Sequence, residues 1–156
     1  MSNDSVTARL QADLTAAMKA RDTVTTSTIR MLRSAITNAE VAGTTATELT
    51  DEQAIAVLQS EAKKRAESAD VYEQAGRAEL AAKERAELEV IERYLPAAMG
   101  DEELAAIIDD EIANAAKEGA EGGRAMGLVI KAVRERAGAT ADGARIAAVV
   151  KSKLGV

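Results

Sequence analysis

Apolar residues recur every three or four positions along almost the whole chain, with polar and charged residues between them. This spacing places apolar side chains on one face of an α-helix, because the helix turns once every 3.6 residues. No stretch shows the strict alternation of apolar and polar residues that is typical of a half-buried strand. The pattern therefore predicts an all-α protein of two helical lobes, with about four helices and then about three.

The first lobe is expected to contain four amphipathic helices, the last two forming a long antiparallel hairpin. Their predicted inward residues are Val6, Leu10, Leu14, Ala17 and Met18, then Ile29, Leu32, Ala35, Ile36 and Ala39 (helix 24–42), then Ile55, Leu58, Ala62 and Tyr72 (helix 50–75), and finally Leu80, Leu88, Ile91 and Leu95 (helix 77–95). Ser5 is the expected N-cap of the first helix, and Gly43 the expected C-terminal glycine of the second.

Local signals also mark the later boundaries. Thr50 and Gln53 have the spacing of a capping box, in which each side chain bonds the other residue's backbone amide. Gly76 is expected to interrupt the hairpin. Pro96, the only proline, disfavours helical backbone at Leu95. We therefore expect one lobe over residues 1–96 and a second over residues 97–156.

The second lobe is expected to contain three helices. Their predicted inward residues are Leu104, Ile107, Ile108 and Ile112, then Met126, Val129, Ile130, Val133 and Ala137, and finally Ile146, Val149, Val150 and Leu154. Gly138 is expected to end the second of these helices and Asp142 to cap the third. The glycines between 119 and 123 follow a helix rather than a strand, so they indicate a turn and not a phosphate-binding loop.

The composition narrows the possible chemistry. The chain has no cysteine and no histidine, which excludes disulfides, thiolate nucleophiles, cysteine-ligated zinc and a Ser-His-Asp triad. We therefore expect no catalytic residue, no metal site and no cofactor; a carboxylate-only Mg²⁺ site is the alternative that the scattered acids leave open. No apolar run is long enough for a membrane span, and residues 1–4 lack the features of a signal peptide, so we expect a cytoplasmic protein without membrane contact.

Charge is unevenly distributed along the chain. The net charge is −6, which argues against a protein built mainly to hold nucleic acid, and no DNA binding is expected. Residues 101–121 contain eight acids and one base, whereas residues 122–156 contain seven bases and two acids. The predicted RNA-binding residues of this basic tail are Arg124, Gly127, Lys131, Arg134, Arg145 and Lys151. The alternative is an ordinary solvated face, balanced by the acidic helix before it.

Other basic and aromatic residues favour structural roles. Arg30 and Arg33 are one turn apart, and residues 63–65 form a basic triplet between Glu61 and Glu67. Pairing with acids on the helix surface is the favoured interpretation of these bases. Tyr72 and Tyr94 could stack on nucleic-acid bases, but packing in a core or an interface is favoured in a chain with no other rings.

Several segments together resemble a known family. They are Ile29-Arg30-Met31-Leu32-Arg33-Ser34-Ala35-Ile36, Tyr72-Glu73-Gln74-Ala75-Gly76-Arg77-Ala78-Glu79-Leu80, Glu84, Glu87-Leu88, Ile91, Tyr94-Leu95-Pro96, Met126-Gly127, Ala141-Asp142-Gly143 and Val150-Lys151. In this order they resemble the GatB/YqeY family, which is similar to the helical and tail portions of the B subunit of glutamine-dependent tRNA amidotransferase. In that enzyme the tail helps to grip tRNA, and the chemistry occurs in a separate domain that has no counterpart here.

The resemblance implies a two-lobe helical fold and suggests contact with tRNA. Our first hypothesis is a non-catalytic RNA-binding module. The second is an adaptor that docks on amidotransferase or translation proteins, and the third is a subunit of a carbon–nitrogen ligase with glutamine as amido-N-donor. The chain also departs from the family pattern, because Leu128 occupies a position that usually holds a base and the loop at 138–141 lacks the usual arginine.

Overall fold

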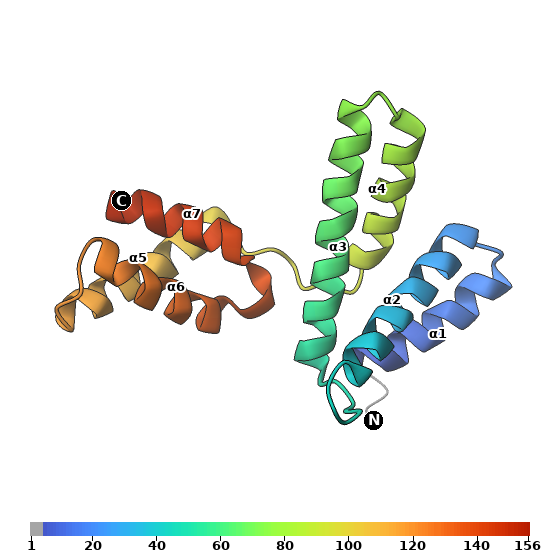
Figure 1. Cartoon of the computed structure of the whole chain (residues 1–156), viewed down its shortest axis with the longest axis horizontal. Coiled ribbons are helices and arrows are strands. Elements are labelled where there is room, and N and C mark those ends of the chain that lie inside the picture. The colour runs from blue at the N-terminus through green and yellow to red at the C-terminus, as the bar shows by residue number, and fades with distance from the viewer. Residues whose placement is uncertain (1–4) are drawn as a thin grey trace. The chain divides into compact units, whose positions relative to one another are not determined.

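The computed structural model describes residues 5–156, and these residues form seven α-helices, one short 3₁₀ helix and no strand (Figure 1). The helices are α1 (Val6–Lys19), α2 (Thr23–Val41), α3 (Asp51–Gln74), α4 (Ala78–Glu92), α5 (Asp101–Lys117), α6 (Gly123–Ala137), η1 (Gly138–Thr140) and α7 (Gly143–Leu154). The all-α prediction is confirmed. The expectation about a signal peptide concerns residues 1–4, which lie outside the described residues.

The helix boundaries follow local capping chemistry. Ser5 and Asp142 accept hydrogen bonds from the backbone amides three residues later, at 3.1 and 2.7 Å, as predicted. The capping box is complete, because the Thr50 amide donates to Gln53 Oε1 at 2.9 Å and the Gln53 amide donates to Thr50 Oγ1 at 3.2 Å. Each of these bonds satisfies an amide that the helix itself leaves unpaired.

The chain divides into two compact units, one ending at Leu95 and the other formed by Pro96–Val156. We call them the N-terminal and C-terminal units. The core of the N-terminal unit draws on four helices and comprises Val6, Leu10, Leu14, Ile29, Leu32, Ile36, Ala54, Leu58, Ala62, Val90, Ile91 and Tyr94. Burial of these side chains is the main stabilising contribution to the unit.

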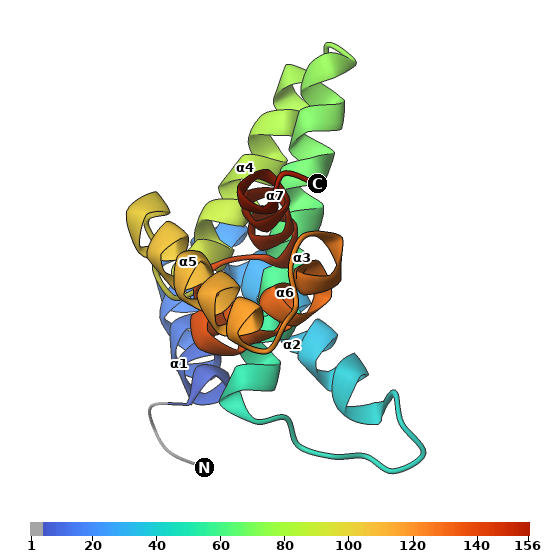
Figure 2. The ribbon, with the colours of Figure 1, turned by 90° about the vertical axis from the view of Figure 1, so that its left-hand side faces the viewer.

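The α3–α4 hairpin extends beyond this core. The two helices lie side by side in both views (Figures 1 and 2), and small side chains at Ala69 and Ala81 are buried along them. Arg85 on α4 forms an ion pair with Glu73 on α3. The outer part of the hairpin is therefore held by close alanine packing and surface charge rather than by large apolar side chains.

A buried tyrosine connects the end of α4 to α1. Tyr94 is 5% exposed, its hydroxyl donates a hydrogen bond to Asp13, and the Arg9 guanidinium lies 5.2 Å from its ring centroid. Burial, followed by the hydrogen bond to Asp13 and the charge of that carboxylate, raises the pKa of Tyr94 well above its usual value of 10.0. The core prediction for this ring is confirmed.

Replacing Tyr94 with phenylalanine is expected to destabilise the N-terminal unit by about 1–2 kcal/mol, because a hydrogen bond to a charged acceptor is lost. An unfolded tyrosine ionises near pH 10, whereas the folded one resists ionisation, so its contribution is complete below pH 10 and falls as the pH rises further. Urea unfolding from about pH 8 to 11 measures both effects. If the wild type and Tyr94→Phe are equally stable and lose stability equally at alkaline pH, the hydrogen bond from Tyr94 to Asp13 does not stabilise the unit.

The C-terminal unit is a three-helix bundle with a separate core. Its buried residues are Leu104, Ile108, Ala115, Ala125, Val129, Val133, Ala137, Ala141, Ile146 and Val150. Ile107, Ile112, Met126, Ile130, Val149 and Leu154 pack against them while keeping some exposure. Gly138 ends α6 with a φ of 56°, a backbone conformation that glycine adopts at little cost. The predicted apolar faces of this lobe are thus the ones that form its core.

Four residues of the first lobe differ from the sequence-based predictions. Met18 is 51% exposed, and Leu80 is 38% exposed because it lies on the part of α4 beyond the core. Gly43 does not have a left-handed backbone; α2 ends at Val41 with a right-handed Ala42 as its C-cap. Tyr72 is only half-buried. Periodicity identified the apolar face of each helix, but it could not show how far along that face the neighbouring helices reach.

Candidate nucleic-acid interface

The outer face of α6 carries most of the predicted binding residues. Ala125, Val129 and Val133 point into the core, and Arg124, Gly127, Lys131 and Arg134 are exposed on the other side of the helix. This separation follows from the 3.6-residue period.

A shallow, open hollow lies on this face, lined by Gly127, Ile130, Lys131, Arg134 and Glu135. Three predicted residues, Gly127, Lys131 and Arg134, are therefore brought together, with Arg124 on the same helix.

Three bases of the tail are paired with acids of α5. Arg136 contacts Glu111 at 3.0 Å and Asp110 at 3.5 Å, and Lys153 contacts Asp109 at 2.9 Å. These pairs hold α6 and α7 against α5, so they are part of the fold.

Arg145 is the third paired base and a predicted binding residue. Its Nη2 lies 2.6 Å from Asp101 Oδ1, and its Nη1 donates to the Met99 carbonyl at 2.7 Å. Its guanidinium therefore ties the start of α7 to the segment that leads into α5. The structure does not group Arg145 with the residues of the hollow.

Four bases of the tail have no ion pair within residues 5–156: Arg124, Lys131, Arg134 and Lys151. All four side chains are exposed. Arg134 also reaches from α6 to the start of α7, because a Cβ added at Gly143 would lie 3.6 Å from its guanidinium carbon. We call Arg124, Lys131, Arg134 and Lys151 the α6–α7 basic surface. Gly143 was not among the predicted binding residues, although it follows the N-cap Asp142.

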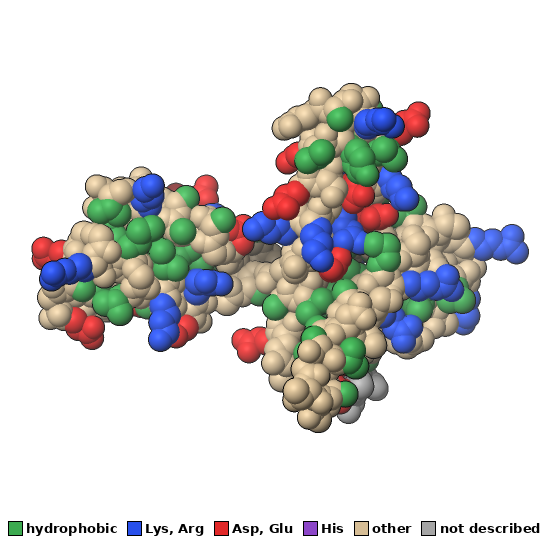
Figure 3. Space-filling view, in the orientation of Figure 1, with side chains coloured by type: hydrophobic (Ala, Val, Ile, Leu, Met, Phe, Trp, Pro, Cys, Tyr) green, Lys and Arg blue, Asp and Glu red, His purple; other side chains and the backbone are tan. Residues whose placement is uncertain are grey.

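The space-filling view supports this description. In Figure 3, Lys and Arg side chains lie over α6 and α7 around a group of hydrophobic side chains. Leu128 is 53% exposed on α6, at the position where the family pattern usually has a base. The acids of α5 that pair with Arg136, Arg145 and Lys153 partly neutralise those bases, so the uncompensated positive charge belongs to the α6–α7 basic surface.

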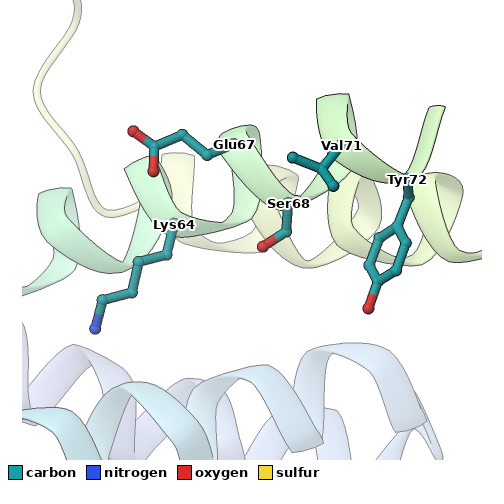
Figure 4. A pocket seen from close by; sticks show the side chains of 5 residues that line it. All are labelled: Lys64, Glu67, Ser68, Val71 and Tyr72. Carbon is teal, nitrogen blue, oxygen red and sulfur yellow. The ribbon is translucent and has the colours of Figure 1, made fainter. Parts of the chain in front are cut away.

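A second hollow lies along one helix of the N-terminal unit. Lys64, Glu67, Ser68, Val71 and Tyr72 line it, all from α3 (Figure 4). It is open to solvent. Ser68 has no histidine that could act as its general base, because the chain contains none. This hollow is therefore not an enclosed ligand site, and its serine has no histidine partner.

Neither a metal site nor a membrane span is found among the described residues. Within residues 5–156, no three acidic side chains are grouped as ligands of a metal ion. None of the helices in this part of the chain combines the length and apolar composition needed to cross a bilayer. The chemistry that the residues of α6 and α7 can supply is attraction and hydrogen bonding to anions.

Comparison with known proteins agrees with the resemblance noted in the sequence. The chain is 32% identical over 137 residues to the protein named "Altered inheritance of mitochondria protein 41, mitochondrial" from Pyrenophora tritici-repentis (strain Pt-1C-BFP), covering 83% of this chain and 71% of the relative. The relative's name places that protein in mitochondria, and the cytoplasmic location of this chain stays a prediction. The family model described as "Yqey-like protein" matches residues 7–154, and the chain therefore belongs to the YqeY-like family.

Proposed function

We propose that this protein is a non-catalytic module that binds RNA, with tRNA as the expected ligand, through the α6–α7 basic surface. The observation that carries the proposal is the division of the tail's bases into two groups. Arg136, Arg145 and Lys153 are paired with acids of α5, whereas Arg124, Lys131, Arg134 and Lys151 are exposed without an acidic partner in the described chain. Unpaired bases on one folded unit favour phosphate binding with release of counterions.

The mode of binding follows from what the unit contains. Both tyrosines of the chain, Tyr72 and Tyr94, belong to the N-terminal unit, so the α6–α7 basic surface has no ring on which a nucleic-acid base could stack. Recognition would therefore depend on phosphates and on the shape of the RNA. The likeness of the family to the tRNA-gripping tail of the amidotransferase supports tRNA as the ligand. Docking on amidotransferase or translation proteins, membership of a carbon–nitrogen ligase and cytoplasmic residence stay predictions.

Titration of fluorescently labelled tRNA with the full-length protein tests this function. Four phosphate contacts give a salt slope of about −3 to −4, so affinity should fall roughly 100-fold between about 50 and 200 mM salt. The affinity is measured by fluorescence anisotropy at several salt concentrations. Absence of binding at about 10 µM protein in 50 mM salt, where phosphate contacts are strong, would refute the proposal.

Gly127 provides a test that leaves the charge unchanged. It lies within α6, and a Cβ added there would meet no atom within 4 Å, so packing does not require glycine at this position. Gly127→Ala is expected to stabilise the C-terminal unit by about 0.5–1 kcal/mol, because alanine favours the helix.

Gly127→Leu should also fold, but its larger side chain would fill the hollow beside Lys131 and Arg134. We expect it to weaken tRNA binding about tenfold, by keeping phosphates away from those bases. Urea unfolding followed by circular dichroism measures stability, and fluorescence anisotropy measures affinity. Binding by Gly127→Leu that equals that of the Gly127→Ala control would show that RNA does not approach this hollow.

A further inference from the structure

A second set of unpaired bases lies on the α1–α2 hairpin. Lys19, Arg21, Arg30 and Arg33 are all exposed, and none has an ion pair within residues 5–156. We call these four residues the α1–α2 basic surface. The favoured interpretation of Arg30 and Arg33 from the sequence was pairing with surface acids, and that prediction is wrong for the described chain. Two positions of α2 that look like ordinary helix-surface charges thus carry uncompensated charge.

The acids of the same hairpin are engaged elsewhere. Asp13 accepts the hydroxyl of Tyr94, and Asp22 caps α2 by accepting from the amide and hydroxyl of Thr25 at 3.0 and 2.7 Å. These bonds from Thr25 hold the pKa of Asp22 below its usual value. Glu40, near the end of α2, accepts from the Leu49 amide at 3.4 Å. Neutral donors satisfy these carboxylates, so the bases of the hairpin remain available.

The four bases form one region around the turn between α1 and α2. Arg30 Nη2 lies 3.8 Å from the sulfur of Met18, which precedes Lys19. Arg33 is one turn of α2 away from Arg30, and Arg21 lies in the turn itself with a φ of 57°. In Figure 3, Lys and Arg side chains gather over α1 and α2 with few acidic side chains among them.

The α3–α4 hairpin, the other hairpin of the N-terminal unit, has a net negative charge. Residues 43–95 contain twelve acids and seven bases, a net charge of −5, whereas residues 5–42 contain three acids and five bases, a net charge of +2. Lys64, Arg65 and Arg85 on the α3–α4 hairpin pair with acids, and its four other bases are outnumbered by the remaining acids. Positive charge in the N-terminal unit is therefore concentrated on α1 and α2, and the field around that hairpin attracts anions.

We propose that the α1–α2 basic surface is a second phosphate-binding surface, which contacts the same RNA as the α6–α7 basic surface; this inference rests on the proposed function. Three of its four bases are arginines, whose planar guanidinium groups bind phosphate in a bidentate manner. Two surfaces that contact one RNA molecule raise its affinity above that of either surface alone, provided that both can be reached at once.

The position of the exposed apolar side chains favours RNA over an acidic protein segment. Val24 and Met31 are each 42% exposed on α2. At about 100° per residue, both lie on the far side of Arg30 from Arg33. Met18 contacts Arg30, and Val41, which is 57% exposed, lies about three turns of α2 beyond Arg30. A protein interface usually combines arginines with a continuous apolar centre, which this arrangement does not provide.

The test uses the full-length protein and labelled tRNA. The test variant is Lys19→Gln, Arg30→Gln and Arg33→Gln; Arg21 is kept, because its left-handed backbone would alter the effect of any replacement. The matched control is Lys63→Gln, Arg77→Gln and Lys83→Gln, which removes the same charge from exposed positions of the α3–α4 hairpin that have no ion pair in the described chain. Circular dichroism and thermal unfolding establish that both variants are folded.

We expect the test variant to bind tRNA about tenfold more weakly than the wild type in 50 mM salt, with a salt slope less steep by about 2–3, since up to three phosphate contacts are lost. The control should change affinity by less than about twofold, because neither proposed surface includes its three bases. If test variant and control bind equally, the inference is wrong. A loss of binding confined to variants of the α6–α7 basic surface would then still support the proposed function, and no effect from either surface would overturn both.

Discussion

Replacing Arg65 with alanine is expected to destabilise the N-terminal unit by about 3 kcal/mol, a large share of the stability of a small protein. Arg65 lies on α3 and is 7% exposed. Its Nη1 lies 2.5 Å from Glu61 Oε2, and its Nε lies 3.5 Å from Oε2 of Glu87 on α4. Glu87 is itself 8% exposed. Removing the guanidinium leaves this carboxylate buried without a counter-charge.

The expected loss of about 3 kcal/mol is the cost of leaving Glu87 buried without its partner. It is not the net contribution of the intact ion pair to the free energy of unfolding. Burying two charges requires their desolvation, and the attraction between them offsets that cost only in part. The double variant Arg65→Met and Glu87→Leu, which replaces the pair with apolar side chains, is therefore expected to be close to the wild type in stability. Glu61 is affected less, because Lys64 also contacts it at 3.1 Å.

Tyrosine fluorescence makes the measurement specific to one unit. The chain has no tryptophan, and both tyrosines lie in the N-terminal unit, so the urea-induced change in fluorescence reports unfolding of that unit alone. Arg65→Ala is compared with the double variant and with Lys64→Ala, whose target is exposed. If Arg65→Ala and Lys64→Ala lose equal stability, the interaction between Arg65 and Glu87 contributes nothing.

The same cluster predicts a dependence on pH. Burial raises the pKa of Glu61, but hydrogen bonds from Lys64 and Arg65 and their charges outweigh this effect and leave it below the usual 4.5. A lowered pKa in the folded state means that the contribution of Glu61 is complete above about pH 4.5 and is lost as the pH falls below it. Arg65→Ala should therefore show a smaller loss of stability on acidification than the wild type.

Much of the fold could be predicted because its signals are local. The capping box of Thr50 and Gln53, the N-caps Ser5 and Asp142 and the helix-ending Gly138 act within a few residues, so their patterns can be recognised in the sequence. The apolar period then identified most core positions. It failed at Met18 and Leu80, whose exposure depends on which side chains of the neighbouring helices cover them.

Contacts between distant residues could not be predicted in this way. Asp13 and Tyr94 are 81 residues apart, and nothing near either residue indicates the other. Arg65 belongs to a basic triplet with flanking acids. Pairing with Glu61 was expected of it, but burial against Glu87 depends on the packing of α3 on α4. The spacing of Glu61 and Arg65 along α3 therefore predicts their ion pair, whereas the burial of Arg65 against Glu87 depends on tertiary packing.

In the candidate site, too, local periodicity could be read from the sequence, whereas contacts between helices could not. The sequence located the bases of α6 on one face, because helical periodicity is sufficient for that purpose. It could not separate Arg145 and Arg136, which pair with acids of α5, from Arg124, Lys131 and Arg134, which do not. Which bases remain free depends on how α5 packs in the bundle. The sequence therefore indicated a basic tail, and the structure reduced it to a defined set of exposed charges.

Charge reversal on α6 is expected to have the largest effect on RNA binding. The variant is Arg124→Glu, Lys131→Glu and Arg134→Glu, and all three side chains are exposed without an ion pair in the described chain. A hydrogen bond from a charged donor to phosphate contributes about 1.5 kcal/mol or more, roughly tenfold in affinity. We therefore expect binding of tRNA in 50 mM salt to weaken by about 100- to 1,000-fold.

The choice of control determines what this result means. Lys63→Glu, Arg77→Glu and Lys83→Glu change the net charge by the same amount at exposed positions of the α3–α4 hairpin. If binding depended only on the net charge of the protein, both variants would lose affinity equally. If the α6–α7 basic surface holds the RNA, the control should keep most of its affinity, because the three replaced bases are not part of that surface and salt screens charges that do not contact phosphate. Equal losses would therefore refute a defined surface even though RNA binding itself had been observed.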